Sequence, residues 1–284
     1  MLALDIKNLS KRYEHFHLQD VSFQLEQGYI MGFIGANGAG KTTTIKSILN
    51  LTRIDSGEIH ILGKNMAEHE VELKQEIGSA FGDINFYTRS KISSLTNVIK
   101  TFYRNWDDAT YHRYMKKFNL IEDKKIAELS TGMKVKYNLA LALSHGAKLL
   151  ILDEPTSGLD PVARDHLLDI FQELVGSGEI SILFSTHITS DLEKCADYIT
   201  YLHNGRIINS AEKEEFIDTY RLLNGRKEQL EQIKDRLISY KTNSFGFTGL
   251  IYTTDLDPAL HLTSTVPNLE EIMIYCSKKE DTYV

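Results

Sequence analysis

Two short stretches of this 284-residue sequence combine residue types that can carry out phosphate chemistry. The first, GANGAGKTTT (35–44), places glycines directly before Lys41 and a run of threonines. Glycines let the backbone turn tightly enough for consecutive N–H groups to point at one anion, and a following helix adds partial positive charge. Lys41 would reach the β- and γ-phosphates of a nucleotide, and the Thr42 hydroxyl would bind Mg²⁺. The alternative is an ordinary glycine-rich turn, and a chance match is expected in about one chain in a hundred of this length.

The second stretch delivers two adjacent carboxylates, Asp153 and Glu154, at the end of the apolar run LLIL (149–152). The apolar run predicts a buried strand, and paired carboxylates at its end suit a cation and a water molecule. The alternative is a charged strand terminus without a chemical role. A further apolar run from Ile180 leads to Thr186 and His187, so we expect His187 at the same edge of the sheet.

The elements that must position these residues can be read from hydrophobic periodicity. Alternating apolar and polar residues over 1–34 predict a β-rich entry, antiparallel at first, that ends in a buried strand before the glycine-rich loop. Thr42 to Leu51 follows as a helix. From Val71 to about Ala147 the spacing is helical and rich in charge, which predicts a helical insertion in an α/β domain.

Two further positions have the character of binding sites. Tyr13 is an aromatic residue in a polar stretch and could stack on a purine, although an isolated, half-exposed tyrosine is common. Ser130 is a good N-cap for the apolar-rich helix that follows, and Gly132 leaves its backbone accessible, so this helix start could hold a second anion.

Composition limits the class of protein. The net charge is −7 and the basic residues are scattered, so nucleic acid is not an expected partner. Only Cys195 and Cys276 are present and no secretory leader opens the sequence, which favours a reducing cytoplasmic setting. The apolar runs are far shorter than the roughly 18 residues a membrane helix needs, so a membrane role would depend on another chain.

In order and spacing these motifs resemble those of the ATP-binding cassette family, over about Leu4 to Ser210. The matching elements are an aromatic for adenine (Tyr13), Walker A (35–42), the signature LSTGM (129–133), Walker B with its glutamate (149–154), the D-loop SGLD (157–160) and the switch histidine (His187).

The resemblance implies an α/β nucleotide-binding domain over residues 1–210, with a P-loop core sheet, an antiparallel β subdomain and a helical subdomain at about 84–146. Residues 211–284 would form a small C-terminal α/β appendage that is regulatory, a dimer contact or plain structural packing.

The resemblance also implies site residues, ATP and Mg²⁺. Glu154 and His187 are the expected catalytic residues, and Thr42 and Asp153 the expected metal ligands. The expected nucleotide-binding residues are Tyr13, Asn37, Gly38, Gly40, Lys41, Thr42, Thr43, Ser130, Gly132 and Asp160. Because the family's signature helix serves the site of a second subunit, two ATP-binding subunits, identical or different, would sandwich two ATP molecules.

Two departures from the family pattern stand out. Thr131 and Met133 replace the second glycine and the glutamine of the usual signature, a change that looks tolerable. The family's Q-loop glutamine aligns with Gly82, which puts coupling to the membrane partner in doubt. The next residue, Asp83, either substitutes as a metal ligand or is only a solvated loop residue.

The implied function is an ATP-hydrolysing subunit that energises a bacterial membrane transporter, an exporter, together with a separately encoded permease. The protein would be cytoplasmic and peripheral on the inner face of the membrane. Residues 129–164 are most similar to single-cassette exporter subunits of Gram-positive bacteria that handle amphipathic peptides, phenol-soluble modulins among them. The alternative is a soluble cassette ATPase that acts as an assembly factor of the iron–sulfur type.

Overall fold

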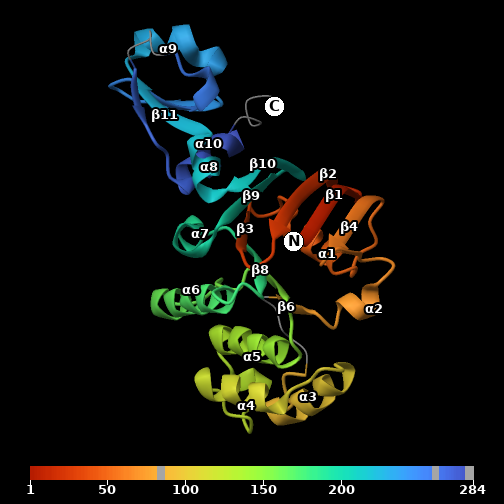
Figure 1. The fold of residues 1–284 in the computed structure, drawn as a ribbon. Coiled ribbons are helices and arrows are strands. Elements are labelled where there is room, and N and C mark those ends of the chain that lie inside the picture. Colours follow the sequence, from red (N-terminus) through yellow and green to blue (C-terminus); the bar gives the residue numbers. More distant parts are fainter. Residues whose placement is uncertain (82–86, 258–261, 279–284) are drawn as a thin grey trace. The chain divides into compact units, whose positions relative to one another are not determined.

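The computed structural model describes residues 1–81, 87–257 and 262–278 (Figure 1). The chain divides into two compact units, Met1–Ile208 and Asn209–Val284, and passes from one to the other within a strand, β10 (Arg206–Glu212). Within the described residues no helix combines the length and the apolar character needed to cross a membrane.

The first unit contains two sheets and their covering helices. Its strands are β1 (Leu2–Arg12), β2 (His17–Glu26), β3 (Ile30–Ile34), β4 (Ser56–Ile61), β5 (Lys64–Asn65), β6 (Ile77–Phe81), β7 (Leu149–Asp153), β8 (Ser181–Thr186) and β9 (Tyr198–His203), with β10 at the boundary. Its helices are α1 (Lys41–Ile48), α2 (Glu70–Leu73), α3 (Ile92–Ile99), α4 (Asp108–Lys117), α5 (Thr131–Ser144), α6 (Pro161–Val175) and α7 (Thr189–Cys195).

The central sheet has the strand order β10-β9-β3-β8-β7-β6. The pairs β9/β3, β3/β8, β8/β7 and β7/β6 are parallel. Strands β3, β7 and β8 are buried at every position, as expected for parallel strands covered on both faces. Helix α6 packs on β3 and β8, α7 on β3, and α1 on β7.

A second, antiparallel sheet with the order β2-β1-β4-β5 shares a core with the central sheet. Phe23 of β2 stacks on Phe33 of β3 with ring centroids 5.4 Å apart. The antiparallel entry expected for residues 1–34 is therefore present in β1 and β2 and is fixed to the strand that leads into the glycine-rich loop.

The helices α3, α4 and α5 form the insertion between β6 and β7 and gather together, away from β1, β2 and β4 (Figure 1). The buried Thr96 hydroxyl joins all three helices, because it hydrogen-bonds the hydroxyls of Tyr111 (3.0 Å) and Tyr137 (2.8 Å). Burial raises the pKa of Tyr111 to about 12 and also raises the pKa of Tyr137. Asp107 caps α4 by accepting from the backbone N–H groups of Ala109 and Thr110.

The second unit is a small α/β fold of its own. Its elements are α8 (Lys213–Asp218), β11 (Tyr220–Gly225), α9 (Lys227–Ile233), β12 (Ser239–Thr242), β13 (Phe247–Tyr252), β14 (Thr263–Thr265) and α10 (Leu269–Lys278). The antiparallel sheet has the order β12-β13-β11-β14. Leu230 and Ile233 of α9 share one apolar cluster with residues of β11 and β13.

Candidate active site

Three parallel strands carry the predicted functional residues to one edge of the central sheet. Residue pairing places Ile34 of β3 beside Thr186 of β8, and Asp153 of β7 beside Ser185 of β8. The carboxyl ends of parallel strands meet at the same edge, where such sheets bind ligands. The glycine-rich loop, the two carboxylates and His187 therefore start from neighbouring points, as the sequence predicts.

The glycine-rich loop is shaped by backbone conformations that favour glycine. Gly38 (φ 82°) and Gly40 (φ 111°) lie in the left-handed region, and a Cβ at Gly40 would come within 2.6 Å of the Phe16 ring. Gly40 is also the N-cap of α1, and no side chain caps this helix start. The first backbone N–H groups of α1 therefore remain available to an anion.

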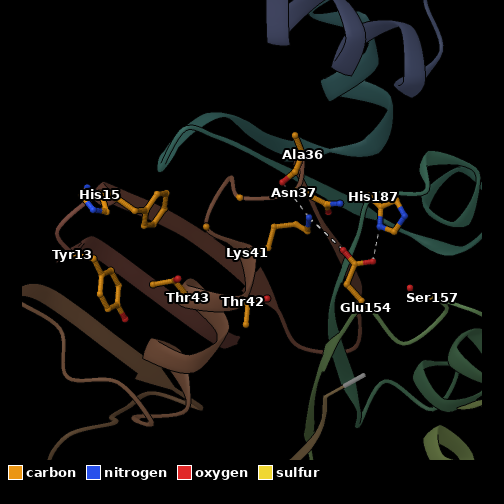
Figure 2. Close-up of a pocket in the computed structure, with 13 residues that line it drawn as sticks. Tyr13, His15, Ala36, Asn37, Lys41, Thr42, Thr43, Glu154, Ser157 and His187 are labelled. Atoms are coloured by element: carbon orange, nitrogen blue, oxygen red, sulfur yellow. Dashed lines mark hydrogen bonds and ion pairs between the residues drawn. The ribbon is translucent and has the colours of Figure 1, made fainter. Parts of the chain in front are cut away.

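Lys41 is almost fully buried and lies against the catalytic carboxylate candidate. Its Nζ donates to the Gly35 carbonyl oxygen (2.8 Å) and lies 3.3 Å from Glu154 Oε1. The second oxygen of that carboxylate, Oε2, is 2.8 Å from His187 Nδ1. Figure 2 shows the Glu154 side chain between the lysine and the histidine, so one carboxylate contacts two groups suited to phosphate.

One serine hydrogen-bonds both residues of the carboxylate pair. Ser185 Oγ donates to Asp153 Oδ1 (2.6 Å) and accepts from the backbone N–H of Glu154 (2.9 Å). Glu154 has a left-handed backbone conformation with φ 50°, which is strained for a residue with a side chain. Glu154 directly follows β7, so the left-handed conformation occurs where the chain leaves the sheet edge.

Two oxygen donors suited to a hard cation lie together beside the loop. The Thr42 hydroxyl donates to Asp153 Oδ2 at 2.8 Å, and Asp153 is 8% exposed. Hydroxyl and carboxylate oxygens are ligands that Mg²⁺ accepts, usually together with water and substrate phosphate. The chemistry of this pair therefore fits the predicted metal ligands.

A pocket of about 760 Å³ contains most of the predicted nucleotide-binding residues. Its lining residues are Tyr13, His15, Phe16, Ala36, Asn37, Gly38, Gly40, Lys41, Thr42, Thr43, Glu154, Ser157 and His187. In Figure 2, Tyr13 and His15 lie at one end of the pocket, and Glu154 and His187 lie at the other. This separation suits an elongated ligand with an aromatic base at one end and phosphates at the other.

The remaining predicted residues lie outside this pocket. Ser130 caps α5 by accepting from the Met133 backbone N–H (3.3 Å), and Asp160 caps α6 by accepting from Val162 and Ala163. Gly132 is in the first turn of α5. The prediction for Asp83 concerns a position outside the described residues, as does the proposed Q-loop position Gly82.

Several pocket and support residues were missed from the sequence. His15 and Phe16 line the pocket, and Ser185 hydrogen-bonds the Asp153 carboxylate and the Glu154 backbone N–H. The only signal for Ser185 is its place near the end of an apolar strand, and it becomes meaningful once the pairing with Asp153 is known.

Comparison with known proteins gives the family. Residues 18–157 match the ABC transporter family. The ABC transporter ATP-binding protein YtrB of Bacillus subtilis is 31% identical over 218 residues, which cover 76% of this chain and 74% of YtrB. The chain belongs to the ABC transporter ATP-binding proteins. The bacitracin transport ATP-binding protein BcrA of Bacillus licheniformis is 34% identical over 71% of this chain and 67% of BcrA.

The fold of this ABC protein agrees with that membership. A solved ATP-binding subunit of an ABC transporter superposes with a TM-score of 0.66 at 30% identity, over 75% of this chain and 91% of the other. The α/β cassette fold predicted from the motifs is confirmed. The protein is an ATP-hydrolysing cassette subunit, and ATP is its nucleotide.

Proposed function

We propose that this ABC protein energises a membrane exporter by ATP-driven pairing of two cassettes. The observation that carries the proposal is the placement of Lys41, Glu154 and His187 in one pocket, while Ser130 and Gly132 lie outside it. One chain would therefore bind the phosphates but lack a signature helix start on the open side of its own site. A second cassette would supply that helix start.

Each pocket residue has a proposed role in hydrolysis. The loop N–H groups and Lys41 bind the phosphates, and Tyr13 stacks on the adenine. Glu154 orients the attacking water and accepts its proton, and His187 contacts the γ-phosphate. These roles require groups that are held in position before the reaction begins. Ser185 supports this preorganisation, because its hydroxyl donates to Asp153 Oδ1 and accepts from the Glu154 backbone N–H.

Thr42 and Asp153 would hold Mg²⁺, with Asp83 as a further candidate ligand. When bound, the ion neutralises charge that develops on the phosphate oxygens. The support for this assignment is the close approach of the Thr42 hydroxyl to Asp153 Oδ2.

The permease would dock on the helical insertion, around residues 84–146. A mostly apolar pocket of about 250 Å³ lies there, lined by Tyr87, Leu95, Ile99, Ile126, Lys134, Tyr137, Asn138 and Leu141. An apolar groove between helices suits an apolar side of a partner helix. This placement would put the protein at the cytoplasmic face of the membrane, with residues 1–210 as the catalytic domain and residues 211–284 as an accessory segment.

The proposed cargo class is amphipathic peptides, of the phenol-soluble modulin type. The relative BcrA is named for transport of bacitracin, and this name supports a peptide cargo. The protein would belong to a Gram-positive type of exporter in which two copies of this chain pair, and pairing with one related cassette subunit is the alternative.

Purification of the full chain from membranes in mild detergent, followed by identification of bound chains, tests this function. The expected result is a polytopic membrane protein at a fixed ratio to the cassette, and ATPase activity that rises when amphipathic peptides are added. A chain found only in the soluble fraction with iron–sulfur assembly proteins would contradict the proposal and favour the assembly-factor alternative.

A further inference from the structure

A buried carboxyl group, that of Asp191, lies next to the catalytic segment but outside the nucleotide pocket. Asp191 is on the first turn of α7, the helix that begins just after His187, and is 1% exposed. Burying a carboxylate is costly unless other groups compensate its charge and its hydrogen-bonding capacity. The groups around Asp191 therefore indicate the role of its buried carboxylate.

The two oxygens of Asp191 have different surroundings. Oδ1 lies 3.7 Å from Arg164 Nη1 on α6, whereas Oδ2 is buried and has no hydrogen-bond partner in the described part of the chain. Burial raises the pKa of Asp191, and the nearby Thr156 hydroxyl and the Arg164 charge act against that rise. Glu154 and His187 also influence this carboxyl electrostatically, so it lies within the field of the catalytic pair.

Thr156 is the natural partner for the second oxygen. It lies in the turn between Glu154 and α6, is 1% exposed, and its hydroxyl likewise has no hydrogen-bond partner among residues 1–81, 87–257 and 262–278. The Thr156 side chain lowers the pKa of Asp191, so the two groups are neighbours, and a hydroxyl donor and a carboxylate acceptor that are both buried can satisfy each other after a small rotation. Leaving both unpaired would be unfavourable.

Thr156 is connected directly to the position of Glu154. In the same turn the Ser157 N–H donates to the Glu154 carbonyl oxygen (3.1 Å), and the Leu159 N–H donates to the Thr156 carbonyl oxygen (3.2 Å). Anchoring the Thr156 side chain therefore fixes the turn that follows the strained Glu154 backbone. A strained conformation persists only where the surrounding structure holds it.

We propose that Asp191 is a positioning residue for ATP hydrolysis: its carboxylate accepts a hydrogen bond from Thr156 and, with Arg164, ties the turn after Glu154 to α6 and α7. This inference rests on the proposed role of Glu154. It also links the segment around His187 to the D-loop side of the site, because Arg164 is on the helix capped by Asp160.

The test compares kcat, KM and nucleotide affinity among full-length variants. Asp191→Ala is expected to lower kcat about tenfold, the effect of one lost hydrogen bond, with KM and the Kd for ATP within about twofold of wild type. Asp191→Asn keeps the shape and two hydrogen-bonding atoms, so it should recover most of the lost kcat. Thr156→Val should reproduce the loss, and combining it with Asp191→Ala should add little.

A matched control removes a different contact between the same two helices. Lys194 of α7 contacts Asp165 and Asp169 of α6, each at 2.6 Å, without touching Thr156. Lys194→Ala should leave kcat unchanged. All assays are run well below the lowest melting midpoint, and Thr156→Val remains an independent test if Asp191→Ala does not fold.

Three results would overturn the inference. They are an unchanged kcat in Asp191→Ala or in Thr156→Val, equal losses in Asp191→Ala and Lys194→Ala, or additive losses in the double variant. Glu154→Gln is measured in parallel: retained turnover there would overturn the assignment of Glu154 itself. Lost turnover in Glu154→Gln with full turnover in Asp191→Ala would overturn only the role of Asp191.

Discussion

Replacing Glu154 by glutamine changes the charge at the centre of the site while keeping the size of the side chain. In the structure one carboxylate oxygen lies 3.3 Å from Lys41 Nζ and the other 2.8 Å from His187 Nδ1. A glutamine can offer an oxygen to only one of these groups. The contacts of Thr42 with Asp153 and of Lys41 with the Gly35 carbonyl do not involve the lost charge.

The expected changes in the hydrolysis rate and in ATP affinity follow from the role of the Glu154 carboxylate in each step. Loss of a general base costs roughly 10²–10⁴-fold in rate, or about 3–5 kcal/mol of transition-state free energy. ATP affinity should not fall, because Glu154 competes with phosphate for Lys41. At 3.3 Å and an effective dielectric constant of about 20, that competing attraction is at most about 5 kcal/mol, and screening reduces it.

The assay is phosphate release under saturating ATP and Mg²⁺, paired with equilibrium binding of a fluorescent ATP analogue. Glu154→Gln should lose at least a hundredfold in kcat while the Kd stays equal or decreases. Glu173→Gln is the matched control, because it removes an exposed carboxylate near the C-terminal end of α6. This carboxylate pairs with Lys117 of α4. Turnover of Glu154→Gln within about twofold of wild type would refute the assignment.

Three further predictions use other residues. Lys41→Ala should weaken ATP binding at least tenfold in the same binding assay, since it removes the buried cation, and an unchanged Kd would contradict that role. Asp83→Ala should require more Mg²⁺ for half-maximal ATPase activity while Mg²⁺-independent nucleotide binding stays intact, and Gly82→Gln should be tolerated; superimposable Mg²⁺ titrations would remove Asp83 from the metal site. Because burial raises the pKa of Tyr111 to about 12 from an ordinary value of 10.0, the folded protein holds this proton more tightly than the unfolded chain. The contribution of Tyr111 to stability in urea should therefore be constant below pH 10 and be lost as the pH rises toward about 12, so between these pH values stability should decline less steeply in Tyr111→Phe than in wild type, and equal slopes would exclude the effect.

The parts of the fold that depend on local sequence could be predicted. The apolar runs that became β3, β7 and β8 are continuous because both faces of each strand are covered. Helix ends were less exact: the helix expected from Thr42 to Leu51 ends at Ile48, and Asn50 takes a left-handed conformation (φ 54°). The residue at which a helix ends depends on the backbone geometry of its last turn, which helix propensities of single residues do not predict.

The site shows the same division between local and tertiary information. Lys41 and Thr42 are adjacent in a recognisable loop, and Glu154 was expected at a strand end. The supporting groups were hidden, because Ser185 acts through the pairing of two strands that are distant in sequence. Asp191 lies in the polar segment TSDLEKC, which looks like a solvated helix face, and only the packing of α7 makes it buried.

The central claim, that two copies of this cassette close over ATP, is tested most directly by light scattering on the full-length Glu154→Gln variant. With slow hydrolysis, saturating ATP should convert a monomer to a dimer at tens of micromolar protein, and ADP should not. Adding Ser130→Phe, which places a bulky side chain at the signature helix start, should abolish the ATP-dependent dimer without changing the Kd for ATP. A strictly monomeric Glu154→Gln protein at saturating ATP would contradict the claim that this chain pairs with a second copy of itself.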